Sequence, residues 1–308
     1  MLRHLPVLAC LLLPPSVAAQ QAQPKTIRVG IIGLDTSHVV AFTRVLNNPN
    51  SRGELAGVRV VAAYPGGSPD LEASRSRVEG FTKTLRETYK VEIVDSIEAL
   101  LLKVDAVLLE SVDGRPHLKQ VIPLLKAGKP VFIDKPVAGS LADALEIFRL
   151  ARKYKVPCFS SSSLRFSPDF QKTLKDPQLG DVVGCVAWSP CSLEKTHPDL
   201  FWYGVHGVET LFTFMGTGCE SVVRTHTPDV DVVTGTWKGG RVGTYRGLRK
   251  GASGYGAMVF GSKSIMPAGK YGGYEPLVVE ICKFFRTGKP PVSAEETIEL
   301  FALMEAAD

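Results

Sequence analysis

Apolar blocks separated by polar turns run along this chain, and one of them lies at residues 26–42. These residues read T-I-R-V-G-I-I-G-L-D-T-S-H-V-V-A-F. The β-branched run Ile27–Ile32 ends at Gly33, and an apolar pattern with helical spacing follows at once. A buried strand that enters a helix through a glycine turn is typical of a doubly wound sheet. There, free backbone N–H groups and a helix N-terminus face an anion.

The following blocks continue this alternation of strands and helices. The pattern predicts strands at 58–64, 91–94, 106–109, 130–133 and 156–160, and helices at 96–102, 117–125 and 141–154. Alternation at this spacing indicates a mostly parallel sheet with helices on both faces. We therefore expect a Rossmann-type, doubly wound α/β domain over residues 25–160.

Short strand-like runs dominate after residue 160. They lie at 182–188, 221–227, 230–237, 241–246 and 256–260, with helices expected near 168–175, 208–215, 276–286 and 293–306. Lys238-Gly239-Gly240 is typical of a hairpin turn. This pattern predicts a C-terminal α+β domain over 161–308, with an open and mostly antiparallel sheet.

The glycine motif of the first turn is altered. If Gly33 is the first glycine of G-x-G-x-x-G, the second position holds Asp35 and the third holds His38. The second position normally lacks a side chain so that a pyrophosphate can approach the backbone. A carboxylate there would repel the phosphates, although Asp is also a favourable helix N-cap.

The end of the second predicted strand departs from the usual pattern as well. Dinucleotide-binding domains carry an acidic residue there for the ribose hydroxyls, whereas this chain has no carboxylate until Asp70. Ser68 together with Arg75 or Arg77 could hold a 2′-phosphate instead. The same arginines could equally form a solvated helix face.

Composition is that of an ordinary globular protein. The chain has 308 residues, of which 44% are hydrophobic and 22% are charged. The net charge is +5, and the basic residues are scattered rather than gathered in a stripe, so no nucleic-acid partner is expected.

The N-terminus has the pattern of a secretory signal peptide over residues 1–19. Arg3 precedes the apolar run Leu5–Leu13, and Val17-Ala18-Ala19 is a small-residue cleavage site. The run is too short to span a bilayer, and no later run is long enough, so no membrane span is expected. We expect a periplasmic or secreted protein. A lipoprotein signal ending at Cys10 and a misplaced start are the alternatives.

The cysteine pattern indicates no metal site. Removal of the leader would leave five cysteines, at positions 158, 185, 191, 219 and 282, without any C-x-x-C spacing. One disulfide is permitted in an oxidising compartment, with Cys185 and Cys191 as the nearest pair. His197 and His226 also lack metal-ligand spacing, so no metal is expected.

Five further segments carry a family resemblance. They are Val104–Leu109, Leu125–Pro136 (L-K-A-G-K-P-V-F-I-D-K-P), Leu164–Pro168 (L-R-F-S-P), Gly204–Gly207 (G-V-H-G) and Phe260–Lys263 (F-G-S-K). In this order the chain resembles the Gfo/Idh/MocA family, named for glucose–fructose oxidoreductase and inositol dehydrogenase. The resemblance implies a Rossmann-type domain followed by an α+β domain that covers the active site and often forms an oligomer. It also implies hydride transfer between NAD or NADP and a sugar or polyol hydroxyl.

The resemblance implies two catalytic residues. Lys135 corresponds to the family lysine and follows a predicted parallel strand, where open α/β sheets place their ligands. Its ammonium could lower the pKa of a neighbouring group or polarise a carbonyl. His206 corresponds to the histidine that takes the alcohol proton. Each could also be a structural residue, a surface lysine after a strand or a histidine at a helix start.

The remaining candidates fall into two groups. Cofactor-binding candidates are Gly33, Asp35, Thr36, Ser37, His38, Ser111, His117, Asp134 and Pro136. Substrate-binding candidates are Arg165, Trp202, Tyr203 and Glu209. The resemblance also implies that the bond before Pro136 is cis.

Individual members of the second group have alternatives. Trp202 stands where related families carry an Asp four residues before the histidine, so Glu209 is expected to orient His206 instead. Trp202 and Tyr203 suit a sugar platform but are also ordinary packing residues. Arg165 is expected to brace the domain interface rather than to bind substrate.

These observations leave two functional hypotheses. The first is an NAD(P)-dependent oxidoreductase acting on a sugar, polyol or glycoside hydroxyl, or a glycoside-cleaving relative that retains NAD. The second is an exported sugar- or ligand-binding protein of the same fold that has lost redox activity. Lys135 and His206 favour the first, whereas Asp35 and His38 favour the second.

Overall fold

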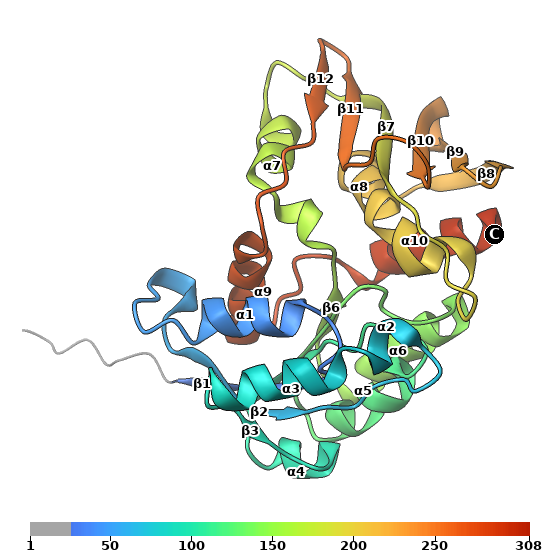
Figure 1. The fold of residues 1–308 in the computed structure, drawn as a ribbon. Coiled ribbons are helices and arrows are strands. Elements are labelled where there is room, and N and C mark those ends of the chain that lie inside the picture. The colour runs from blue at the N-terminus through green and yellow to red at the C-terminus, as the bar shows by residue number, and fades with distance from the viewer. Residues whose placement is uncertain (1–25) are drawn as a thin grey trace, which may run out of the picture.

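The computed structural model describes residues 26–308, and Figure 1 shows two sheets that lie one above the other. The predicted signal peptide and Cys10 lie outside the described residues, so export stays a prediction. Among the described helices, none is both long and apolar enough to cross a membrane.

The first sheet has six parallel strands in the order β3-β2-β1-β4-β5-β6. They are β1 (Ile27–Ile32), β2 (Val58–Tyr64), β3 (Glu92–Ile93), β4 (Ala106–Leu109), β5 (Val131–Ile133) and β6 (Cys158–Ser160). The strand order reverses between β1 and β4, which is the switch point where open α/β sheets bind ligands. The doubly wound parallel sheet predicted from the sequence is confirmed.

Helices cover both faces of this sheet because its strands are apolar on both sides. One face packs against α1 (His38–Leu46), α3 (Val78–Glu87) and α9 (Glu275–Thr287). The other packs against α4 (Ile97–Leu101), α5 (His117–Lys126) and α6 (Leu141–Tyr154). Ile31 and Ile32 illustrate the division, because they are consecutive in β1 and belong to opposite cores.

The second sheet has the order β12-β11-β7-β10-β9-β8 and is mixed, because only β7 and β10 pair in parallel. Its strands are β7 (Val182–Pro190), β8 (Cys219–His226), β9 (Val230–Trp237), β10 (Arg241–Leu248), β11 (Gly256–Gly261) and β12 (Ile265–Ala268). Helix α8 (Val205–Met215) packs on one face, against the buried Trp237 and Tyr245. The mostly antiparallel sheet is confirmed. The predicted hairpin turn has Gly239 and Gly240 at positive φ.

Several elements differ from the sequence-based expectation. Strand β3 has two residues rather than four, and the segment after β2 contains two helices that the pattern did not predict, α2 (Glu72–Arg75) and α3. Strand β12 was also missed. A 3₁₀ turn (Ser163–Phe166) leads into α7 (Pro168–Lys175).

The two C-terminal helices do not stay with the second sheet. Helix α9 lies beside α1 on the first sheet (Figure 1), where Leu277 and Ile281 join the core of β1. Helix α10 (Ala294–Ala307) packs against both α6 and α8. The two C-terminal helices therefore link the two sheets.

Candidate active site

A cavity of about 370 Å³ lies between the carboxyl edge of the first sheet and the second sheet. Its lining residues are Thr36, Ser37, His38, Arg77, Val112, Lys135, Ser163, Leu164, Ser192, Trp202, Tyr203, His206, Tyr255, Tyr271 and Tyr274. Both domains contribute to the lining, because it includes residues from the loops after β1, β4 and β5 and from the start of α8. The fold thus brings together candidates that are far apart in the sequence.

Lys135 and His206 face this same cavity. Lys135 follows β5, and its bond to Pro136 is cis. Its Nζ lies 5.8 Å from the centre of the Tyr203 ring, and that ring lies 5.0 Å from the His206 ring. Burial, together with the nearby Lys135 charge, holds the pKa of His206 well below its ordinary value. The imidazole is therefore neutral at mild pH and able to accept a proton.

Ser162, rather than Glu209, contacts the His206 ring. The expectation that Glu209 orients the imidazole directly is corrected, because Ser162 Oγ lies 2.8 Å from His206 Nδ1. Ser162 Oγ also accepts the Leu164 N–H. When Nδ1 carries the ring proton and donates to the same oxygen, Nε2 is left with the free lone pair.

Glu209 acts one step further from the cavity. Its carboxylate accepts the Ser161 hydroxyl, the Ser162 N–H at 2.7 Å and Arg165 Nε at 2.9 Å. Burial raises the pKa of Glu209, and the Arg165 guanidinium opposes that shift. Glu209 therefore fixes the Ser161–Ser162 backbone that supports the histidine. His206 and Glu209 are one helical turn apart on α8, and that spacing alone does not predict that Ser162 lies between them.

Arg165 braces the interface and does not line the cavity. Its guanidinium bridges Glu209 and Glu296, with Nη2 at 2.6 Å from Glu296 Oε1. Glu296 belongs to α10, so this buried ion pair joins the 3₁₀ turn after β6 to the C-terminal helix. The substrate role considered for Arg165 is not supported by its position.

Aromatic residues form one wall of the cavity. Trp202 lies beside His197, with 5.0 Å between the ring centres. The Tyr203 hydroxyl lies 3.1 Å from that of Tyr255. Sequence reasoning found Trp202 and Tyr203 but missed Tyr255, Tyr271 and Tyr274. A tyrosine next to a glycine, as in Tyr255-Gly256 and Tyr271-Gly272, was the available signal in these loops.

The N-terminus of α1 forms the opposite wall. Thr36, Ser37 and His38 line the cavity there, and Arg77 reaches the same space from the segment between α2 and α3. A helix N-terminus with adjacent hydroxyl groups and a guanidinium is a favourable setting for a phosphate. Arg77 was considered in the sequence only as one of two arginines that could bind a 2′-phosphate.

Asp35 turns away from the cavity and is completely buried. Its Oδ2 accepts the Ser74 hydroxyl at 2.6 Å, and its Oδ1 accepts the Val112 N–H at 2.8 Å. Burial raises the pKa of this carboxyl, although both hydrogen bonds oppose the shift. The second link crosses between the loops after β1 and β4, directly at the switch point. Asp35 therefore bridges the crevice in which a dinucleotide normally lies.

Three other cofactor candidates pack beneath the loops. Gly33 has φ +85°, and a Cβ there would overlap the Oγ and N of Ser111. The Ser111 hydroxyl donates to Gln120 Oε1 at 3.0 Å. His117 is buried, with Nε2 at 2.9 Å from the Ser111 carbonyl oxygen. These residues hold the two turns together, and Ser111 and His117 do not line the cavity.

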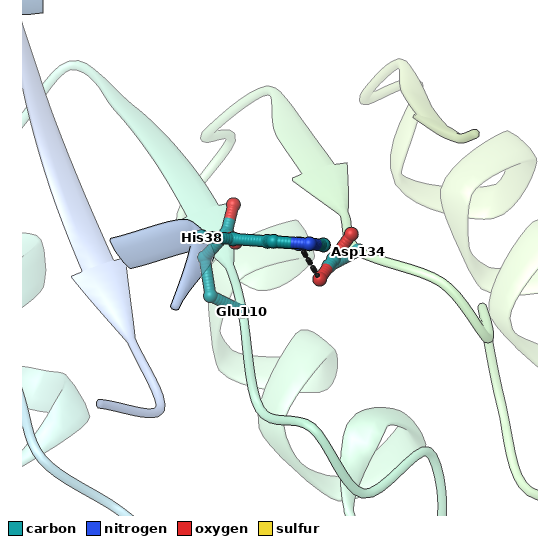
Figure 2. A group of neighbouring side chains, drawn as sticks. All are labelled: His38, Glu110 and Asp134. Atoms are coloured by element: carbon teal, nitrogen blue, oxygen red, sulfur yellow. Dashed lines mark hydrogen bonds and ion pairs between the residues drawn. The ribbon is translucent and has the colours of Figure 1, made fainter. Parts of the chain in front are cut away.

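His38 and Asp134 form a separate cluster with Glu110, shown in Figure 2. His38 Nδ1 lies 2.6 Å from Asp134 Oδ2 and 4.0 Å from Glu110 Oε2. Sequence reasoning did not select Glu110, although it stands directly after β4 at the carboxyl edge of the sheet. Spacing could not reveal the group, because His38 and Asp134 are 96 positions apart.

The cysteines form no bridge within the described residues. All five, including the candidate pair Cys185 and Cys191, are free thiols.

The fold joins a Rossmann-type domain to an additional sheet domain, with a cavity between them. A family described as "Oxidoreductase family, NAD-binding Rossmann fold" matches residues 27–162, nearly all of the first unit. Residues 27–162 of the chain are therefore similar to the Gfo/Idh/MocA family of NAD-binding oxidoreductases. The resemblance read from the sequence is thereby confirmed.

Individual relatives agree with this assignment. Inositol 2-dehydrogenase 1 of Saccharopolyspora erythraea is 29% identical over 184 residues, covering 57% of this chain and 50% of that protein. The alignments span half or less of the length of the curated relatives.

Solved structures share the fold over nearly the whole chain. The myo-inositol 2-dehydrogenase of Lactobacillus plantarum has a TM-score of 0.74 at 15% identity, covering 91% of this chain and 96% of its own. GenD2 from gentamicin A biosynthesis, solved in complex with NAD, has a TM-score of 0.72 at 15% identity, covering 96% of both chains.

Two cavities lie where the two ends of a dinucleotide bind in Rossmann-type domains. The 370 Å³ cavity offers the N-terminus of α1, Arg77 and Lys135. A second cavity of about 720 Å³ lies at the end of β2, where the adenosine end belongs, and includes Tyr64 and Gly66 in its lining. The contact between Asp35 and Val112 joins the loops after β1 and β4 at the switch point of the sheet.

Proposed function

We propose that this protein is an NAD(P)-dependent oxidoreductase that acts on a hydroxyl group of a sugar or polyol. The observation that carries the proposal is the placement of Lys135 and His206 on one cavity beside the N-terminus of α1. The match of residues 27–162 to an NAD-binding oxidoreductase family and relatives named inositol 2-dehydrogenase support the redox class and the polyol substrate.

The residues of the cavity suit alcohol oxidation. The neutral His206 imidazole accepts the hydroxyl proton at Nε2 while Ser162 holds Nδ1. The Lys135 ammonium stabilises negative charge that develops on the substrate oxygen. Tyr203 and Trp202 offer aromatic faces to the C–H surface of a ring. When bound, the nicotinamide supplies the acceptor for the hydride.

Two measurements test the proposal. The purified protein is denatured and its supernatant analysed by mass spectrometry for released NAD or NADP. A panel of inositols and aldoses is then assayed for formation of reduced nicotinamide, with Lys135→Met as the control variant. Turnover that disappears in the variant is expected. Absence of turnover across the panel, together with no response of the melting temperature to any dinucleotide, contradicts the proposal.

A second function is favoured by one observation, the Asp35 bridge across the crevice. A ligand-binding protein of the same fold without redox activity would keep the cavity and dispense with the dinucleotide path. A glycoside-cleaving relative with retained NAD would instead keep the cofactor permanently in place. A melting temperature that rises with sugars but not with dinucleotides favours the ligand-binding protein. Cofactor released on denaturation favours the glycoside-cleaving relative.

A homodimer or homotetramer through the second sheet remains part of the proposal. Helix α8 covers only one face of that sheet, and Val183, Val223 and Val242 are exposed on its strands. Light scattering of the purified protein tests this point. Export to the periplasm or medium likewise stays a proposal, tested by cell fractionation.

A further inference from the structure

We propose that His38, Glu110 and Asp134 form a binding site for one divalent transition-metal cation of the Zn²⁺ or Mn²⁺ type. The three side chains come from three neighbouring elements, the start of α1 and the ends of β4 and β5. Figure 2 shows them converging at the carboxyl edge of the first sheet. This inference does not depend on the proposed function, because its readout is metal binding.

The distances suit a shared cation. The candidate donor atoms all lie within 4.8 Å of one another. His38 Nδ1 lies 2.6 Å from Asp134 Oδ2 and 4.0 Å from Glu110 Oε2. Zinc ligands sit about 2.0–2.2 Å from the metal, so tetrahedral ligands are separated by about 3.3 Å. The two observed separations lie on either side of this value, and side-chain shifts below about 1 Å bring both to it.

Unpartnered buried carboxylate oxygens point to a missing positive charge. Glu110 is completely buried, and neither of its oxygens has a hydrogen-bond partner among residues 26–308. Asp134 is 2% exposed, and its Oδ1 has no partner within the same described range. Buried carboxylates are costly unless they are paired, protonated or bound to a metal.

The charges that face the cluster offset this deficit only in part. Glu110 lies near the carboxylates of Asp134 and Asp35, and Lys135 is the nearby cation that acts on it. Asp134 is paired with His38, which is also the ring that would ligate the metal. A divalent cation would neutralise Glu110 and Asp134 together, whereas one proton neutralises only one of them.

The donor set favours a borderline transition metal. One imidazole and two carboxylates suit Zn²⁺, Mn²⁺ or Fe²⁺ better than Ca²⁺ or Mg²⁺, which prefer oxygen ligands. Three protein ligands also leave a coordination position open, as in catalytic zinc sites. His38 lines the 370 Å³ cavity, so an open position there would be available to a substrate oxygen.

The competing explanation is a protonated Glu110 beside a His38–Asp134 ion pair. Direct metal measurements separate the two. The full-length purified protein is treated with a chelator, and Zn²⁺, Mn²⁺ and Co²⁺ are titrated by calorimetry, with bound metal counted by mass spectrometry. We expect one cation per chain and a rise in melting temperature. We also expect Co²⁺ absorption bands typical of nitrogen and oxygen ligation.

Variants locate the site. Glu110→Gln and Asp134→Asn keep side-chain volume and are expected to weaken binding at least tenfold. His226→Gln is the matched control, because His226 Nδ1 also lies 2.7 Å from a carboxylate, Asp231, at a separate place in the fold. The metal affinity of His226→Gln is expected to equal that of the unaltered protein.

Two results overturn the inference. One is a folded protein that takes up none of the three cations. The other is Glu110→Gln binding with unchanged affinity while His226→Gln loses it, which would place the cation at the control pair. If a variant fails to fold, the Co²⁺ spectrum and stoichiometry of the unaltered protein still decide whether a cation binds.

Discussion

Asp35 Oδ1 accepts the backbone N–H of Val112 at 2.8 Å and so connects the loops after β1 and β4 across the switch point of the sheet. The residue stands where the dinucleotide fingerprint has its second glycine. Its carboxylate is buried and does not line the cavity. We expect this contact to restrict the binding of a dinucleotide.

Asp35→Gly is expected to strengthen binding of NAD(H) or NADP(H), because it removes both the bridge and the negative charge. Loss of the hydrogen bonds to Val112 and Ser74 should also destabilise the protein by about 1–3 kcal/mol. Calorimetric titration gives the affinity, and urea denaturation gives the stability. Asp35→Asn is the control, since it removes the charge but keeps the bridging shape. Equal affinity in all three proteins would show that the bridge does not restrict the cofactor.

Acidification is expected to destabilise the protein partly through His206. Burial and the Lys135 charge lower the pKa of His206 in the folded state, whereas in the unfolded chain this histidine has its ordinary pKa of about 6.5. Below that pH the unfolded state binds a proton that the folded state does not. The contribution of His206 to the free energy of unfolding is therefore fully present above about pH 6.5. It decreases as the pH falls toward the folded-state pKa, by at most about 1.4 kcal/mol per pH unit.

His206→Asn should therefore lose less stability than the unaltered protein between about pH 7.5 and pH 5. Urea denaturation at both pH values measures the difference between the two proteins. Identical losses in the two proteins would mean that the histidine titrates normally in the folded state.

Glu209→Gln is expected to lower turnover and to shift the acid limb of the pH–rate profile, because Ser162 would no longer be held against His206. It should also cost about 2–4 kcal/mol of stability, since the buried Arg165 loses one of two carboxylates. Glu296→Gln is the control, because it removes the other carboxylate of Arg165 without contacting Ser162. A purely structural role for Glu209 predicts that both variants keep the same pH profile.

Gly33→Ala is expected to unfold the protein or to destabilise it by more than about 3 kcal/mol. The residue has φ +85°, and a methyl group would overlap Ser111. Gly80→Ala is the comparison, because Gly80 lies inside α3 with open space around its Cβ position. That substitution should stabilise the protein by about 0.5–1 kcal/mol. Thermal denaturation of both variants is the measurement, and a stable Gly33→Ala would contradict the assigned turn geometry.

Local pattern was sufficient for the elements that carry the site. The β-branched run before Gly33 could only be a buried strand leading into a turn, and the capped pattern of residues 141–154 predicted α6 to its ends. Lys135 was found because it follows a predicted parallel strand and matches the family lysine, whereas His206 was found through the resemblance of Gly204–Gly207 to the family motif. Helix α2 has only four residues and gives no periodic signal, whereas α3 was missed although Val78, Phe81 and Leu85 stand at helical spacing.

The sequence by itself determined the two-sheet architecture, the family resemblance and the two residues proposed for catalysis, because these depend on periodicity and on short contiguous motifs. Only the tertiary structure decided the direction of Asp35, the support of His206 by Ser162, and the grouping of His38 with Glu110 and Asp134. The contacts Ser162–His206, Asp35–Val112 and His38–Asp134 join residues 44 to 96 positions apart. They exist because strand order brings the loops after β1, β4 and β5 to one edge and the second sheet packs against it. The spacing of residues along the chain does not reveal that strand order.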